Sequence, residues 1–162
     1  MSKQEVRQAV TGHLKRASAY CNEGNYNRAI EEYSEATKLD PNAPDAYLGR
    51  CGVYAATSAN DLAIADCNMV IWLDAKNAMA YLNRGIAYLN KGDVNQAIAD
   101  YDRAIVLDPN NANAYFFRGG AYIRKGNYNQ AISDCEKAIE LNPNNALAKQ
   151  MLEAARQAMF KR

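Results

Sequence analysis

The segment AYLNRGIAY, residues 80–88, recurs as AYFFRGGAY at residues 114–122. The same offset links Gly92 with Gly126, and AYLGR at residues 46–50 continues the series towards the start of the chain. The two segments are 34 residues apart, and similarity at a fixed period of this length is typical of proteins that stack copies of one supersecondary unit. We therefore divide the chain into four units, residues 10–43, 44–77, 78–111 and 112–145.

Each unit is predicted to contain two helices. Tyr81, Gly85 and Tyr88 are spaced by four and three residues, which places them on one face of a helix. Gly92 then supplies a residue that tolerates a left-handed conformation, and Pro109 disfavours helical geometry in the residue before it. The pattern predicts a helix, a tight turn, a second helix and a stop in every unit.

The repeat resembles the tetratricopeptide repeat family over about residues 10–145. The positions that match the family signature are Tyr81, Gly85, Tyr88, Ala97, Tyr101, Ala104 and Pro109. The resemblance implies one all-α domain over residues 1–162: a right-handed α-solenoid of four helix-turn-helix repeats, followed by a C-terminal capping helix at residues 146–160. The second repeat departs most, with Cys51 at the signature glycine and Ser58 at the turn glycine.

Composition excludes several classes of partner. The chain has 19 Lys and Arg against 18 Asp and Glu, so no net field attracts nucleic acid or an anionic membrane. The polar N-terminus and the lack of a long apolar run predict neither a signal peptide nor a membrane span, and we expect a cytoplasmic protein.

The cysteines are interpreted as buried thiols in a reducing compartment. Cys21, Cys51, Cys67 and Cys135 show no Cys-x-x-Cys spacing and no clustered histidine, so we expect neither a structural zinc site nor a disulfide framework.

Enzyme chemistry has little support. The only histidine, His13, occupies the repeat position that holds Tyr47, Tyr81 and Tyr115 elsewhere, which favours packing over catalysis. We therefore expect no enzymatic activity, no cofactor and no metal.

The resemblance implies a concave groove, lined by the first helix of each repeat, that binds an extended or helical segment of a protein partner. Gly49, Gly52 and Ala55 remove side-chain volume from one wall, whereas large apolar groups line the others, which favours a bulky apolar anchor. Asparagine side chains are suited to hydrogen bonding with a peptide backbone. The predicted groove residues are Leu48, Gly49, Gly52, Ala55, Leu82, Asn83, Ile86, Leu89, Asn90, Asn113, Phe116, Phe117 and Arg124.

Three alternatives stay open for this groove. The terminal helix or a neighbouring molecule covers it, Phe116 or Phe117 packs beneath the terminal helix, or the protein is an oligomeric assembly or secretion-chaperone-like protein that shields an apolar partner segment. A homo-oligomer would then form through residues 146–160.

Some family members clamp the acidic C-termini of chaperones with basic and asparagine side chains. In one frame the corresponding positions here hold Leu14, Ser18, Gly49, Met79 and Asn83, and in the next Leu48, Gly52, Asn83, Asn113 and Phe117. Neither frame has a basic side chain to pair with carboxylates, so such tails are disfavoured as ligands.

Charged residues also repeat in phase. One arginine in the first helix of each repeat is followed 16 residues later by an acidic residue in the second helix. This constant separation predicts structural ion pairs within or between repeats. The pairs are Arg16 with Glu32, Arg50 with Asp66, Arg84 with Asp100, and Arg118 with Asp134.

Overall fold

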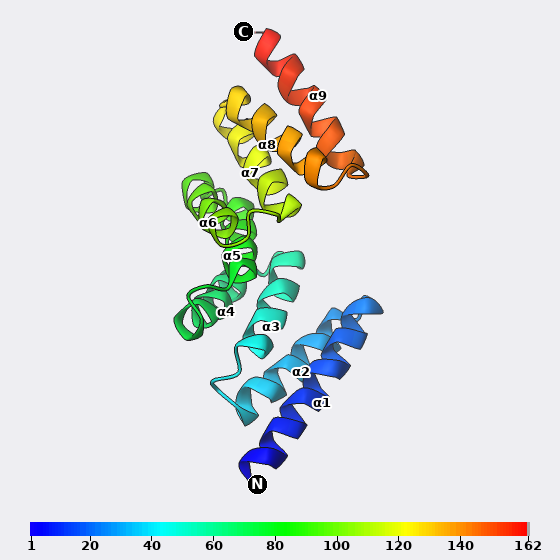
Figure 1. The fold of residues 1–162 in the computed structure, drawn as a ribbon. Coiled ribbons are helices and arrows are strands. Elements are labelled where there is room, and N and C mark those ends of the chain that lie inside the picture. Colours follow the sequence, from blue (N-terminus) through cyan, green and yellow to red (C-terminus); the bar gives the residue numbers. More distant parts are fainter. Residues whose placement is uncertain (162) are drawn as a thin grey trace.

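The computed structural model describes residues 1–161, which form helices joined by short turns (Figure 1). Ser2 caps the first helix in a capping box, because its hydroxyl accepts from the Glu5 amide while the Glu5 carboxylate accepts from the Ser2 amide. The helices within this range are α1 (Lys3–Asn22), α2 (Tyr26–Leu39), α3 (Pro44–Ala56), α4 (Asn60–Leu73), α5 (Ala78–Lys91), α6 (Val94–Leu107), α7 (Ala112–Lys125), α8 (Tyr128–Leu141) and α9 (Ala146–Phe160).

The turns follow the chemistry of their residues. Gly92 and Gly126 end α5 and α7 in the left-handed region, with φ of 89° and 73°. Ser58, at the corresponding place after α3, takes φ of 60° and is the non-glycine residue of the described chain with positive φ. The second repeat thus keeps the family turn without its glycine.

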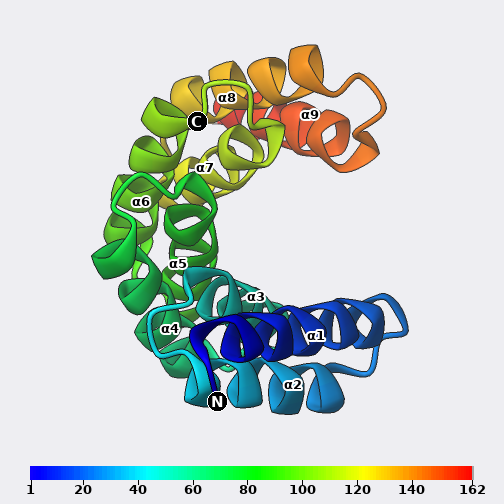
Figure 2. The ribbon, with the colours of Figure 1, turned by 60° about the horizontal axis from the view of Figure 1, so that its bottom comes forward.

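Helices pair within each unit and the pairs stack into a curved solenoid. Figure 2 shows a C-shaped arc with α2, α4, α6 and α8 along its outer side and α1, α3, α5 and α7 along its inner side. Small residues make close stacking possible: Ala46, Ala80, Ala114 and Ala148, which occupy equivalent positions of α3, α5, α7 and α9, are all fully buried. The predicted all-α solenoid of four helix pairs with a C-terminal helix is confirmed.

The signature glycine of the first helix packs against one side chain of the second helix in the same unit. In the third unit this pair is Gly85 and Tyr101, and a Cβ atom at Gly85 would lie 2.6 Å from the Tyr101 ring. In the fourth unit it is Gly119 and Cys135, with 3.3 Å from such a Cβ to the Cys135 sulfur. A side chain at Gly85 would therefore force the Tyr101 ring to move, whereas one at Gly119 would make a tight contact with Cys135.

In the second unit the same pair of positions holds Cys51 and Cys67, which form a disulfide. The expectation that all four cysteines are reduced thiols was wrong for these two. The antiparallel packing of α3 and α4 brings their Cα atoms to 5.6 Å, within the range that a disulfide spans. Cys21 and Cys135 are the free cysteines of residues 1–161, and burial raises the pKa of the Cys135 thiol to about 11.

The predicted ion pairs are confirmed in all four units. Arg50, Arg84 and Arg118 each donate two hydrogen bonds, from Nε and Nη2, to the two oxygens of the paired aspartate at 2.7–2.8 Å. The three aspartates, Asp66, Asp100 and Asp134, are buried. Arg16 makes a single, more exposed bond to Glu32 at 3.0 Å.

The arginines also join successive repeats. The Nη1 group of Arg84 donates to Asn68 of the preceding repeat at 2.6 Å, and that of Arg118 donates to Asp102 at 2.7 Å. The Nη1 group of Arg50 likewise donates to the Ser34 hydroxyl of the preceding repeat. Each of these arginines therefore bonds the second helix of its own repeat and that of the repeat before it.

Candidate peptide-binding groove

The predicted groove residues lie on the first helices, which line the inner side of the arc in Figure 2. They do not all reach its surface. Leu82 is 2% exposed and packs in a core cluster with Tyr101, and Ala55 is 5% exposed in a cluster with Cys51 and Cys67. These two predicted groove residues are therefore core residues.

Gly49 has a packing role in the structure. A Cβ atom at this position would lie 2.3 Å from the ring of Tyr33, a residue of α2 in the preceding repeat. The volume that Gly49 lacks is therefore occupied by that ring. Gly52 is more open, because the nearest atom to its added Cβ is the Asn83 side-chain nitrogen at 3.4 Å.

The half-buried apolar members of the predicted groove set on α5 and α7 are Ile86, Leu89, Phe116 and Phe117. Ile86 and Leu89 pack against the core cluster around Tyr101 and remain partly accessible. Phe117 stacks on Tyr101 with ring centroids 6.1 Å apart, and Phe116 meets Phe117 edge to face at 5.3 Å. Phe117 is thus held by α6, and Phe116 lies beside it.

The polar groove residues differ in how far they are already engaged. The Asn90 amide donates to Asn60 at 3.3 Å, and Arg124 donates to the Leu89 carbonyl at 2.7 Å, linking α7 to the end of α5. Asn113 is exposed, and its backbone amide is bound by Asn111.

The C-terminal helix α9 stacks on α8 as the first helix of a further repeat would. Ala148, Leu152 and Ala155 are buried, whereas Leu147 is 63% exposed. The sulfur of Met151 lies 3.6 Å from a Cβ placed at Gly120, so α9 contacts the inner face of α7.

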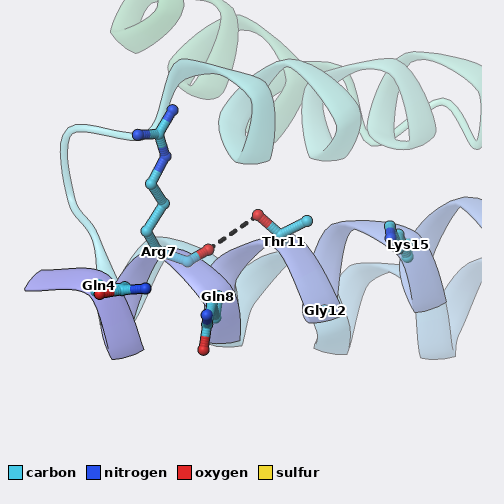
Figure 3. Close-up of a pocket in the computed structure, with 6 residues that line it drawn as sticks. All are labelled: Gln4, Arg7, Gln8, Thr11, Gly12 and Lys15. Carbon is cyan, nitrogen blue, oxygen red and sulfur yellow. Dashed lines mark hydrogen bonds between the residues drawn. The ribbon is translucent and has the colours of Figure 1, made fainter.

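A hollow of about 670 Å³ lies along α1 and was missed by the sequence analysis. Figure 3 shows polar side chains of a single helix around it, with the Thr11 hydroxyl donating to the Arg7 carbonyl at 2.9 Å. Part of it precedes the first repeat, so the repeat frame did not reveal it, although the spacing of its residues along one helix face was a readable signal. The lining residues are Gln4, Arg7, Gln8, Thr11, Gly12 and Lys15.

His13 belongs to an ion-pair cluster. Its Nδ1 atom lies 2.7 Å from a Glu32 oxygen that also accepts from Arg16 Nε. The hydrogen bond from Arg16, followed by that from His13, lowers the pKa of Glu32 despite its partial burial. Within residues 1–161 no group of three or more His, Cys, Asp or Glu side chains is placed to hold a metal ion.

Within residues 1–161, no helix is both long enough and apolar enough to cross a membrane.

Comparison with solved structures places this fold among known proteins. A crystal structure of MamA matches with a TM-score of 0.79 and 27% identity, covering 94% of this chain and 83% of that chain. The first TPR domain of Spaghetti (RPAP3), bound to the HSP90 peptide SRMEEVD, matches with a TM-score of 0.70 and 26% identity over 73% of this chain and 94% of that chain.

A third structure, PilF of Pseudomonas aeruginosa, has a TM-score of 0.85 at 19% identity, covers 97% of this chain and 72% of that chain, and shows the shared solenoid fold alone. No curated protein sequence gives a significant match. Family models described as tetratricopeptide repeat and TPR repeat match residues 82–146 and 17–58. Together with the helix pairs and the period of the repeat, these matches establish that the chain belongs to the tetratricopeptide repeat family.

Proposed function

We propose that the protein is an interaction scaffold or adaptor that binds an extended or helical peptide segment in its concave groove. The observation that supports this most is the row of partly accessible apolar side chains on the inner side of α5 and α7, namely Ile86, Leu89 and Phe116, beside the side-chain-free surface of Gly52. Concave apolar surfaces with a few polar groups are typical of peptide and ligand sites.

In this proposal an apolar side chain of the ligand is the anchor. Burying a Leu-sized or Phe-sized group contributes about 1.5–3 kcal/mol, which is enough to dominate a weak peptide interaction. Asn83 and Asn113 hydrogen-bond the ligand backbone. Arg124 contributes less than its charge alone would indicate, because one of its donors already binds the Leu89 carbonyl.

The RPAP3 domains bind chaperone peptides with consecutive acidic residues, SRMEEVD and SGPTIEEVD. The present groove has different chemistry, since Leu48, Asn113 and Phe117 occupy positions where such ligands would need basic side chains. The ligand is therefore proposed to be apolar at its anchor. Arg7 and Lys15 line the hollow on α1 and are proposed to contact polar groups at one end of the ligand.

The test uses a peptide selected from a randomised displayed library as the probe. Gly52→Leu places a side chain against Asn83 and fills the open part of the groove, and it should weaken the selected peptide by at least about tenfold. Isothermal titration calorimetry measures this. Ser133→Leu, which adds the same side chain on the exposed outer face of α8, is the matched control and should bind normally.

The dependence on salt is a second part of the same test. An apolar anchor predicts affinity that changes little between low and moderate salt, because exposed charges are screened and buried apolar contacts are not. Normal binding by Gly52→Leu, or a collapse of affinity with added salt, would contradict the proposal.

A further inference from the structure

The outer face of α4 differs from the same face of the other second helices. Its four outward positions hold Leu62, Ala65, Met69 and Trp72, which we call the α4 stripe. The equivalent positions hold Arg28, Glu31, Glu35 and Lys38 in α2, Gln96, Ala99, Arg103 and Val106 in α6, and Gln130, Ser133, Lys137 and Glu140 in α8. The first and fourth repeats thus place polar or charged groups at all four positions, the third repeat alternates polar and apolar groups, and the second repeat places a continuous apolar row there.

The α4 stripe is open to solvent in the single chain. Trp72 is 74% exposed and Leu62 is 54% exposed, and Figure 2 shows α4 on the outer side of the arc. These residues lie on the side of α4 away from its buried residues Ala63, Cys67 and Val70. Met69 is half-buried and the other three residues are exposed, so the stripe contributes little to the core and is not part of the concave groove.

We propose that the α4 stripe is the contact surface for a second copy of this chain, paired antiparallel about a two-fold axis near the middle of α4. Its residues are spaced by three, four and three, the alternation that a helix uses to pack against a partner helix. In the antiparallel pair, Leu62 of one copy lies opposite Trp72 of the other, and Ala65 lies opposite Met69. Near the axis the small Ala65 faces the larger Met69, and at each end two large apolar side chains meet, so that one patch is complementary to itself as a two-fold contact requires.

The charges at the two ends of α4 fit the same arrangement. Asp61 at the first turn forms an ion pair with Lys91 of α5, and its side chain, which is still 84% exposed, would also face the exposed Lys76 that follows the helix in the other copy. Asp74, also beyond the C-terminal end, would face the N-terminus of the other α4. That end begins after Ala59, whose methyl side chain cannot cap it, and the positive end of the helix dipole favours a carboxylate there.

The same charges argue against a lipid surface, because peripheral helices that bind anionic membranes carry Lys and Arg along their polar side. Here the neighbours of the stripe are Asp61, Asn68, Asp74 and Lys76.

The available area sets the strength of the contact. A single exposed aromatic side chain offers about 150–250 Å², and the whole stripe offers roughly 400 Å² per copy. Standard stable interfaces bury roughly 800 Å² per partner, so this contact with its polar rim belongs to the weak, transient class. The dimer is therefore concentration-dependent, and it leaves both concave grooves free.

The experiment combines sedimentation equilibrium with tryptophan fluorescence, since Trp72 is the only tryptophan in the sequence. From low micromolar to near-millimolar concentration, the mean mass should rise above the monomer value of 17.9 kDa and the Trp72 emission should shift to shorter wavelength over the same range. Trp72→Lys should remain monomeric throughout. Val106→Lys, an equally placed exposed residue of α6, is the matched control and should dimerise as the original protein does.

The folded state of Trp72→Lys is checked by circular dichroism, and the fluorescence change in the original protein is independent of any variant. Lys76→Glu should also weaken the dimer, because it places a carboxylate opposite Asp61. A mass that stays at the monomer value, an emission that does not change with concentration, or association lost in Phe160→Lys but kept in Trp72→Lys would overturn the proposal. An emission shift caused by anionic vesicles at concentrations where the protein is monomeric would also overturn it.

Discussion

Replacing Arg84 with Met is expected to lower the free energy of unfolding by about 3 kcal/mol, because it leaves the buried Asp100 carboxylate without its bidentate partner. Asp100 is 6% exposed, and the lost side chain also donates to Asn68 of the preceding repeat. The change therefore removes both an internal ion pair and a bond between repeats. Urea unfolding followed by circular dichroism measures the effect.

Arg103→Met is the control for the Arg84 experiment, since Arg103 is an exposed arginine of the same repeat and its loss should cost well under about 1 kcal/mol. Arg84→Met combined with Asp100→Asn should recover part of the loss, because the uncompensated buried charge is removed. Equal stability of the Arg84 and Arg103 variants would show that the ion pair does not stabilise the fold. Loss of peptide binding in a fully folded Arg84 variant would instead place this arginine in the binding site.

Opening the Cys51–Cys67 disulfide is expected to cost a similar amount, about 3 kcal/mol, because the bond closes a loop with a sequence separation of 16. The effect should be local, since solenoid repeats are stabilised mainly by their nearest neighbours. Hydrogen exchange in residues 44–74 should accelerate on reduction while residues 78–107 change less. The second repeat also carries Gly49 and Gly52 inside a helix, which lowers its intrinsic helix stability.

The control for the reduction experiment is the double variant Cys51→Ala with Cys67→Ala. Its unfolding midpoint should lie below that of the oxidised protein and should not respond to reductant. A reductant-insensitive midpoint in the original protein, with both cysteines shown to be oxidised beforehand by mass spectrometry, would contradict a stabilising role for the disulfide.

The fold and the ion pairs were predictable from the sequence because their signals are periodic. The Cys51–Cys67 disulfide was not predicted, although it has the same periodic signal. A sequence separation of 16 identifies residues that face each other across a helix pair, and Arg84 with Asp100 was recognised in this way. Cys51 and Cys67 have the same separation and face each other in the same way, whereas a Cys-x-x-Cys motif describes cysteines that are close in sequence and carries no information on contacts across a helix pair.

The sequence predicted which helices carry the groove residues, but not how deeply each of these residues is buried. Repeat position shows that Leu82 and Ile86 lie on the inner helices, whereas burial depends on the side chains that pack against them. Leu82 is covered, and the space beside Gly49 is filled by Tyr33 of the neighbouring repeat. Contacts of this kind depend on how one repeat is oriented against the next, which the sequence of a single unit does not encode.

The most direct measurement for the binding proposal is a methyl NMR titration with the library-selected peptide. The proposal predicts that methyl resonances of Ile86 and Leu89, on the inner side of α5, shift with added peptide. Leu62 and Val106, on the outer faces of α4 and α6, should keep their resonances at protein concentrations where the chain is monomeric. Shifts confined to these outer residues, with Ile86 and Leu89 unchanged at saturation, would contradict a concave peptide-binding groove.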